Sequence, residues 1–528
     1  MRRQILETLT LEKIVGGGQA LGTLADGRKC FVWGGLPGET VTVRITKKKS
    51  HFVEAVVEEV ISPSPDRIQP RDPDSYLSTS PWQIMPLEIE QIYKRQLIDD
   101  AFTLHNVALP AAIDIYCNNV AYGYRNKVEF SWYSESVASR AISQKKSGLA
   151  YVGPELFSDN NQEIDADSDR EESSGDTLDL AFFRRGSKGK IVVDGTSLAR
   201  PEINNLARAI RDLLRHKRVA ARQLKTLLIR CDQSGSCVWQ LYVKDRLPEI
   251  ITADEAAKLP AQGGEIIYSD PRSPASRITE RLARFGDTTL TDTVLGVPFR
   301  YACEGFFQVN IPVYDQALRD MQQWTGRDYS DQQRVISQKK SGQHRESKQH
   351  GSSNSFSEGF AFPASVRQER QLNQLAARRP EEKDVCETGE PALDLYAGVG
   401  TIGLTIGSGN VTLVEINADA VREMQRNITE LGCTDARAVL APSEQALDYI
   451  TGKEIVIVDP PRAGLHPDII ATLLQKLPPR IIYLSCNPVT QARDVSLLQE
   501  KYEIMHHQGY NFFPRTPHIE HLVILDNK

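Results

Sequence analysis

Short apolar runs separated by helical patterns fill the last quarter of the chain. Four of these runs have the length of buried strands: residues 392–396, 411–416, 455–458 and 481–484. A helical pattern over residues 417–431 stops at Gly432, and Pro488 begins another helix after the fourth run. Two last runs have the pattern of a closing hairpin: residues 503–513 and 518–525. The rhythm of strand, helix and strand predicts a doubly wound α/β domain with a Rossmann-like sheet.

The first 62 residues have a different pattern. Apolar runs such as residues 40–45 and 53–60 alternate with glycine-rich turns. Short strands at this spacing predict a five-stranded, OB-like β-barrel for residues 1–62. The lysines of residues 47–49 form a basic hairpin tip beside His51 and Phe52. This tip fits a nucleic-acid contact or a plain solvated turn equally well.

The middle of the chain lacks a repeated strand–helix rhythm. After a proline-rich linker at residues 63–73, a helical pattern and several alternating strands predict a central α+β domain over residues 74–300. Two polar segments without periodicity are predicted to be disordered, one near residues 143–179 and one near residues 332–378. Both share the heptapeptide Ile-Ser-Gln-Lys-Lys-Ser-Gly, which is typical of inserted sequence. Residues 301–528 then form the third domain.

Composition and charge limit the cellular compartment and the classes of partner that the chain can have. The 528 residues are 40% hydrophobic and 25% charged, which is ordinary for a globular protein. No apolar run approaches the roughly 20 residues of a membrane helix, and the start lacks a secretory signal. Eight scattered cysteines form no disulfide framework, so we expect a cytoplasmic protein. The net charge is −6, but residues 155–180 hold ten acidic residues and one arginine, so the remaining chain carries +3. A nucleic-acid partner is therefore not excluded.

Cys486 lies directly after a predicted buried strand, within Ser-Cys-Asn-Pro. Open α/β sheets build their sites at the carboxyl ends of strands, so a thiol held there can act as a nucleophile. The alternative is a small buried hydrophobic residue, which is the usual role of a free cysteine. A single cysteine motif does not decide between the two.

The segment from Gly398 to Gly403 follows the first strand of the α/β domain, and Glu415 ends the second. Such a glycine turn lets a ligand approach the backbone, and a carboxylate at Glu415 can bind ribose hydroxyls. Nicotinamide cofactors, S-adenosylmethionine (SAM) and a plain tight turn with a surface carboxylate all fit this pattern. Asp459, followed by two prolines and Arg462, adds a rigid exit from the third strand that holds its carboxylate in the cleft.

Together these motifs resemble the RNA (uracil-5-)-methyltransferase family. The resemblance rests on six stretches: Asp394-Leu-Tyr-Ala-Gly-Val-Gly, Asp459-Pro-Pro-Arg-Ala-Gly, Ser485-Cys-Asn-Pro with Ala492-Arg-Asp, Phe513-Pro-Arg-Thr-Pro-His-Ile-Glu, Glu304-Gly-Phe-Phe-Gln-Val-Asn and Tyr124-Arg-Asn-Lys. The N-terminal barrel is similar to the TRAM module of many members. The resemblance covers nearly the whole chain except the two polar segments. It favours a nucleophilic role for Cys486 over the role of a small buried hydrophobic residue.

The resemblance implies a SAM-dependent methyltransferase domain over residues 301–528 that forms 5-methyluridine. It implies that Cys486 is the nucleophile and Glu520 the base. Residues of the implied SAM site are Gln308, Tyr396, Gly398, Glu415 and Asp459. Uracil C5 is a poor nucleophile until a group adds to C6, and a thiolate is the best side chain for that addition. The cysteine therefore has the chemistry that the reaction requires.

One stretch departs from the family pattern. Many relatives hold a four-iron, four-sulfur cluster through three cysteines after the barrel and one later, but residues 74–83 contain no cysteine. Cys117 alone could survive as a ligand, so we expect no iron–sulfur cluster and no metal. The RNA target stays open: ribosomal RNA is the first expectation, because members with the barrel often act there, and transfer RNA is the alternative. A monomer is expected. A catalytically silent RNA-binding protein and a nicotinamide-dependent oxidoreductase are the competing interpretations.

Overall fold

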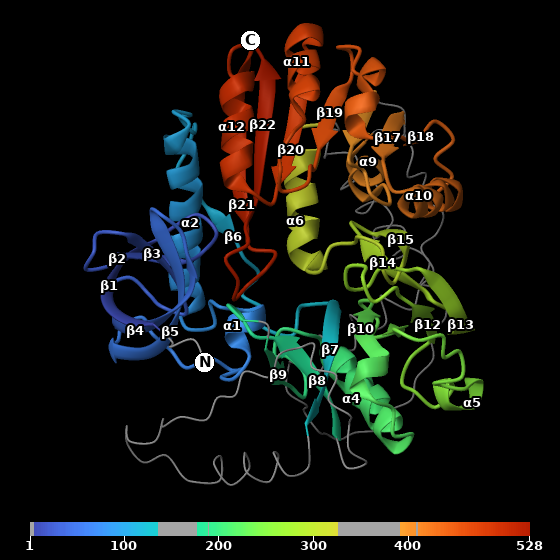
Figure 1. Ribbon diagram of the computed structural model, residues 1–528. Helices are drawn as coiled ribbons and strands as arrows, with labels where there is room; N and C mark the ends of the chain where they lie inside the picture. The colour runs from blue at the N-terminus through green and yellow to red at the C-terminus, as the bar shows by residue number, and fades with distance from the viewer. Residues whose placement is uncertain (1–4, 136–176, 188, 326–390, 408–409) are drawn as a thin grey trace, which may run out of the picture.

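The computed structural model describes residues 5–135, 177–187, 189–325, 391–407 and 410–528. Figure 1 shows an N-terminal barrel, a central part and a C-terminal α/β part. The polar segment near residues 332–378 lies outside the described residues, as do residues 143–176. Thr177–Asp179 begin a strand, so the prediction of disorder up to residue 179 was wrong for these three residues. Acidic residues surround Leu178 and Leu180 in the sequence, so the apolar pattern of this strand is not recognisable there. Both leucines are buried in the structure.

The N-terminal barrel is closed, as predicted, in the strand order β1-β2-β3-β5-β4. Its strands are β1 (Leu6–Ile14), β2 (Ala20–Thr23), β3 (Lys29–Trp33), β4 (Thr40–Lys48) and β5 (Phe52–Ser62). Alternate residues of each strand face inward, and Val41, Val43, Val53 and Ala55 are fully buried in its core. The barrel is followed by α1 (Tyr76–Thr79) and the long helix α2 (Leu87–Leu104). No helix among the described residues is long and apolar enough to span a membrane.

The central part is a seven-stranded sheet in the order β13-β12-β11-β10-β7-β8-β9. Its strands are β7 (Lys127–Glu135), β8 (Thr177–Phe183), β9 (Lys190–Val192), β10 (Leu224–Cys231), β11 (Cys237–Val243), β12 (Gly263–Tyr268) and β13 (Glu280–Gly286). Helix α4 (Pro201–His216) covers this sheet with an apolar stripe that includes Ile203, Leu206, Ile210 and Leu214. The short helices α5 (Ala253–Ala256) and η1 (Ala221–Gln223) connect its strands, and the hairpin β14 (Thr289–Val294) and β15 (Val297–Ala302) follows.

The C-terminal part is an eight-stranded sheet in the order β18-β17-β16-β19-β20-β22-β21-β6. Its strands are β16 (Ala392–Leu395), β17 (Val411–Glu415), β18 (Arg437–Leu440), β19 (Ile455–Val458), β20 (Arg480–Ser485), β21 (Tyr502–Tyr510) and β22 (Glu520–Asn527), with β6 (Ile115–Tyr116) at the edge. The helices of this part are α6 (Ile311–Gln322), α9 (Thr401–Ile406), α10 (Ala418–Glu430), η2 (Ser443–Gln445), η3 (Leu447–Tyr449), α11 (Pro467–Lys476) and α12 (Pro488–Leu498). The five strands from β18 to β20 are parallel, and β22 runs antiparallel to β20 and β21. This is the predicted Rossmann-like sheet closed by a hairpin.

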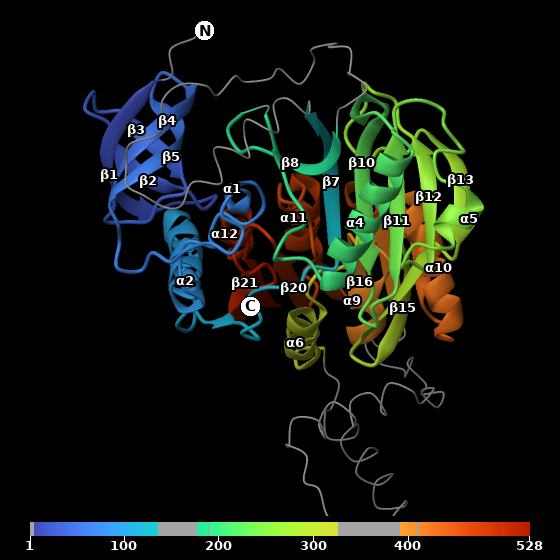
Figure 2. The ribbon, with the colours of Figure 1, turned by 90° about the horizontal axis from the view of Figure 1, so that it is seen from below.

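Two elements cross the domain boundary predicted at residue 300. Strand β6, from the predicted central domain, pairs with β21, and helix α2 packs along α12. Ile98 and Phe102 of α2 share a buried core with Val495 of α12. Figure 2 shows the barrel beside α2, so that this helix lies between the barrel and the C-terminal sheet. Helix α2 and strand β6 are therefore built into the C-terminal part.

Removing residues 147–175 should leave the fold intact. Strands β7 and β8 pair antiparallel, and Glu135 at the end of one lies opposite Thr177 at the start of the other. The described residues on either side of the gap are therefore adjacent, and after the deletion enough residues remain between them to close a hairpin loop. We expect thermal unfolding within a few degrees of the intact chain. A control deletion extended through Asp179 removes part of β8 and should destabilise the protein clearly. Equal loss in both deletions would contradict the prediction.

Candidate active site

A cavity of about 1650 Å³ lies between the central and C-terminal parts. All seven residues predicted from the sequence line it: Gln308, Tyr396, Gly398, Glu415, Asp459, Cys486 and Glu520. Five of them follow or end parallel strands of the C-terminal sheet, whose carboxyl ends meet at one edge. Gln308 comes from the opposite wall, immediately before α6. The structure therefore brings the complete predicted set together.

The glycine turn after β16 is shaped by Glu415. One carboxylate oxygen accepts a hydrogen bond from the backbone N–H of Gly398 at 3.0 Å, and the other accepts one from the N–H of Asn417 at 2.8 Å. Gly398 has a φ of +57°, and a Cβ atom there would meet no atom within 4 Å. The turn thus exposes backbone to the cavity. Each Glu415 oxygen keeps a lone pair for a ligand hydroxyl.

Beneath this turn lies a buried carboxyl group, Asp394. It is 1% exposed, and its Oδ2 accepts a hydrogen bond from the N–H of Gly403 at 2.8 Å, while its Oδ1 has no partner among the described residues. Burial raises the pKa of Asp394 to about 8, and the charges of Asp459 and Glu415 add to the effect. The group is therefore mostly protonated at neutral pH.

Cys486 and Glu520 are neighbours across two strands. Ser485 pairs with His521 in the antiparallel register of β20 and β22, so the next residue of one strand and the preceding residue of the other lie side by side. Asp459 follows β19, the parallel neighbour of β20, and completes the group. Cys486 is half-buried, and Glu520 is only 4% exposed. A thiol and two carboxyl groups thus share one end of the cavity.

These three groups hold protons more strongly than usual. Burial raises the pKa of Cys486 to about 12, with further increases from the charges of Glu520 and Asp459. Burial raises the pKa of Asp459 to about 7. The pKa of Glu520 is raised well above its usual value by burial and then by the charge of Asp459. Since like charges at close range disfavour each other, the two carboxyl groups titrate as a pair rather than independently.

Arg462 and His518 border the same end of the cavity. The guanidinium of Arg462 lies 2.9 Å from Nδ1 of His518. Burial and the positive charge of Arg462 lower the pKa of His518 to about 4, which keeps the imidazole neutral. Arg462 also counteracts the carboxylates, because its charge lowers the pKa of Glu520. Arg462 therefore places a positive charge beside the two carboxyl groups.

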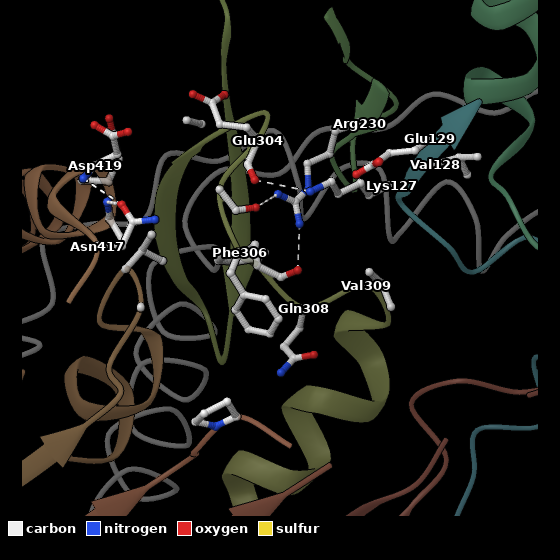
Figure 3. Close-up of a pocket in the computed structure, with 18 of the residues that line it drawn as sticks. Lys127, Val128, Glu129, Arg230, Glu304, Phe306, Gln308, Val309, Asn417 and Asp419 are labelled. Atoms are coloured by element: carbon white, nitrogen blue, oxygen red, sulfur yellow. Dashed lines mark hydrogen bonds between the residues drawn. The ribbon is translucent and has the colours of Figure 1, made fainter. Parts of the chain in front are cut away.

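The opposite wall is fixed by Arg230, which sequence reasoning missed (Figure 3). This side chain is 1% exposed and donates hydrogen bonds to the backbone carbonyls of Cys303, Gly305 and Phe307. Its guanidinium also lies 4.9 Å from the ring centre of Tyr301. The loop that leads to Gln308 is thereby held in one conformation. The available signal was a charged residue near the end of the apolar run of β10, where burial requires dedicated partners.

The described residues contain no group of three or more His, Cys, Asp or Glu side chains that could hold a metal ion. Residues 74–83 contain no cysteine, and Gln83 donates hydrogen bonds to Ser80 and Asp72. These side chains do not fit an iron–sulfur cluster. The absence of a cluster remains a prediction.

Comparison with known proteins gives a family match for the N-terminal region and another for the C-terminal region. Residues 385–528 match the model of the tRNA (Uracil-5-)-methyltransferase family, and residues 7–57 match the TRAM domain. Uncharacterised RNA methyltransferases resemble the chain over nearly its full length. The one of Nitratidesulfovibrio vulgaris is 25% identical over 98% of this chain and 96% of its own. That of Lactobacillus johnsonii is 23% identical over 95% and 94%.

A solved structure has a similar overall fold. The tRNA (uracil-54, C5)-methyltransferase of Pyrococcus abyssi, in complex with S-adenosyl-L-homocysteine, superposes with a TM-score of 0.63. The two sequences are 18% identical, and the match covers 98% of this chain and 99% of that one. At this identity the likeness concerns the fold, including the barrel, the central part and the Rossmann-like sheet.

Fold and site together define a SAM-dependent methyltransferase with an N-terminal TRAM barrel. Residues 385–528 of the chain match the RNA (uracil-5-)-methyltransferase family, and the relatives that match nearly the whole chain are named RNA methyltransferases. This confirms the family and the fold class predicted from the motifs, and it replaces the oxidoreductase that the glycine turn alone left open. The domain boundaries, the roles of the seven site residues, the monomeric state and the cytoplasmic location stay predictions.

Asp394→Asn should stabilise the protein increasingly as the pH rises from about 4 to 8. The pKa of Asp394 is raised to about 8 in the folded state, whereas an unfolded aspartate has a pKa near 3.9. Folding therefore takes up a proton within this window, and the contribution of Asp394 to stability falls as the pH rises through it. Asparagine keeps an acceptor for the Gly403 N–H without this titration. Thermal unfolding at pH 5, 6.5 and 8 measures the difference, and a pH-independent difference would contradict it.

Proposed function

We propose that the protein methylates C5 of a uridine in RNA through a covalent bond between Sγ of Cys486 and C6 of the base. The observation that carries this proposal is the convergence of Cys486, Glu520 and Asp459 at one end of a cavity that also contains the glycine turn and Glu415. A thiol, a carboxyl base and a ligand cradle in one cleft are the parts that this reaction needs. The family assignment supports the choice of uracil.

The cavity fits SAM. Gly398 leaves open space for a ligand against the backbone, and Glu415 presents a carboxylate at the end of the neighbouring strand, where ribose hydroxyls can donate to it. Across the cavity, Gln308 presents a side-chain amide that makes no hydrogen bond to the described protein (Figure 3). Tyr396 and Asp459 complete the proposed site. SAM, when bound there, supplies an electrophilic methyl group.

The residues of this chain perform the remaining chemistry. As the thiol proton passes to the carboxylate of Asp459, Sγ of Cys486 adds to C6, which breaks the C5–C6 double bond of uracil and makes C5 a nucleophilic enolate carbon. Once C5 carries the methyl group, Glu520 removes the C5 proton, the double bond re-forms and the thiolate leaves. In the RNA-free protein the pKa of Cys486 is about 12, because the thiol is buried beside two carboxyl groups. The thiol therefore keeps its proton at neutral pH until it attacks.

The raised pKa of Glu520 suits a base that works late in the reaction. Burial and the charge of Asp459 make its carboxylate a stronger proton acceptor than an exposed glutamate. The buried position also places the carboxyl next to Cys486 and hence near the face of a base bonded to Sγ. The target uridine has to leave its stack to reach this depth, or come from a loop.

Ribosomal RNA remains our first proposal for the substrate, and transfer RNA is the alternative. The rRNA proposal rests on the TRAM barrel, whereas the solved protein of similar fold acts on tRNA. Mapping 5-methyluridine in both RNA classes, from cells with and without the enzyme, decides between them. Loss of the modification from tRNA alone would refute the ribosomal assignment.

Glu520→Gln should add to the base and accept the methyl group but stall before release. Glutamine cannot remove the C5 proton, so a methylated protein–RNA adduct should accumulate as a slow band on a denaturing gel. Cys486→Ala should form no adduct, either alone or combined with Glu520→Gln. Normal turnover of Glu520→Gln without a trapped band would show that another residue is the base, and Asp459 would be the first candidate.

Glu415→Ala should weaken SAM binding by about 1–3 kcal/mol, the scale of a lost hydrogen bond to a charged group. The loss includes the release of the glycine turn, because Glu415 accepts the N–H of Gly398. Asp419→Ala is the matched control, since Asp419 also lines the cavity but pairs with Arg422 instead of the turn. Calorimetry measures both affinities. Unchanged binding in Glu415→Ala would remove this residue from the site.

A further inference from the structure

The loop of residues 511–519 connects β21 to β22 and delivers Glu520 to the cavity. Within it, Arg515 has a φ of +66°, a left-handed conformation that is rare for a residue with a side chain. Such a conformation persists only where the surrounding structure imposes it. The contacts that impose it come from three segments far away in the sequence.

Helix α2 holds the start and the middle of the loop. Glu90 accepts hydrogen bonds from the side-chain amide of Asn511 and from the backbone N–H of Arg515, both at 2.9 Å. Lys94 forms an ion pair with Glu90 at 2.9 Å and donates to Oδ1 of Asn511 at 2.6 Å. Glu90 and Lys94 are both fully buried. From the central part, the hydroxyl of Tyr124 donates to the carbonyl of Pro514 at 3.0 Å.

Trp82 connects the loop to the barrel. Its backbone N–H donates to the carbonyl of Arg515 at 3.1 Å. Its indole Nε1–H donates to the carbonyl of Gly18, in the turn between β1 and β2, at 3.0 Å. The side chain is 2% exposed, so both hydrogen bonds are shielded from water.

The barrel also touches the loop directly. A Cβ atom added to Gly18 would lie 2.1 Å from Cβ and 2.6 Å from Cγ of Pro517. The backbone of Gly18 therefore packs against the proline ring with no space for a methyl group. Pro517 precedes Glu520 by three residues, a reach of at most about 10 Å even in an extended chain. The barrel thus braces the loop close to the proposed base.

We infer that Gly18 and Trp82 form a seat for the loop of residues 511–519, through which the N-terminal barrel positions Glu520. This inference rests on the proposed function and adds a role for the barrel in the chemical steps, beyond holding RNA. Gly18 and Trp82 are positioning residues, because they act on Glu520 through Pro517 and Arg515. A displacement of about 1 Å at a catalytic group is enough to slow a reaction by about 100-fold.

The chain supplies a matched pair of variants to test this. Gly17 and Gly18 have φ angles of +92° and +88°, so alanine is strained to a similar extent at either position. A Cβ atom at Gly17 would meet nothing within 4 Å, whereas one at Gly18 would collide with Pro517. Gly17→Ala therefore reproduces the backbone strain without the push on the loop.

We expect Gly18→Ala to lower kcat for RNA methylation about tenfold or more relative to Gly17→Ala. The KM for RNA and the Kd for SAM should change less than about threefold. Because release depends on Glu520, Gly18→Ala should also accumulate protein–RNA adduct, as a weaker form of the Glu520→Gln behaviour. Adding Pro517→Gly, which removes the atoms in collision, should restore part of kcat. A merely structural role of Gly18 would lower thermal stability without producing trapped adduct.

Equal kcat in the two alanine variants, or a change in the KM for RNA alone, would overturn the inference and leave the barrel as an RNA anchor. If Gly18→Ala fails to fold, Trp82→Phe decides, since it removes the indole N–H donated to Gly18 while it keeps an aromatic ring at this position. Trapped adduct in Trp82→Phe supports the seat, and wild-type kinetics refute it. A wild-type enzyme that forms neither adduct nor 5-methyluridine would instead refute the proposed function itself.

Discussion

The register between β20 and β22 is the constraint on which the candidate active site depends. A slip of one residue would turn Glu520 to the other face of the sheet, and a slip of two would separate it from Cys486. Both strands are apolar on both faces, so hydrophobic patterning does not select the register. Polar contacts fix it at the two ends. Arg480 forms two hydrogen bonds of 2.6 Å with Asp526, and the side chain of Gln491 bridges the carbonyls of Tyr483 and His521.

Once the register is set, burial determines the chemistry. Cys486, Asp459 and Glu520 lie where water stabilises charge poorly, so each holds its proton more strongly than it would in solvent. For the two carboxyl groups this raises basicity, so that each carboxylate is a stronger proton acceptor than an exposed one. For the thiol it suppresses unproductive reactivity in the RNA-free protein. The same environment that keeps the proposed nucleophile protonated at rest therefore strengthens the proposed base.

Sequence patterns predict those parts that depend on short-range order. The strands of the C-terminal sheet are recognisable as apolar runs, and the site residues follow them directly, so motif and strand end coincide at Asp459 and Cys486. Three features escape such reasoning. Strand β6 has two residues and no pattern of its own, and its pairing with β21 follows only from tertiary packing. Arg230 stands in an apolar strand but finds its partners more than 70 residues away. The contact of Gly18 with Pro517 joins the two ends of the chain.

The buried pair of Glu90 and Lys94 shows why such distant contacts are retained. Removing two charges from water is costly, and apolar side chains of similar volume often stabilise a core equally well or better. An apolar pair, however, could not hold the N–H of Arg515 or the side-chain amide of Asn511, and the left-handed turn at Arg515 would lose its support. The ion pair is therefore better explained by the loop geometry than by stability. Because the same loop rests on Gly18 of the barrel, the position of Glu520 depends on all three parts of the protein rather than on the Rossmann-like sheet alone.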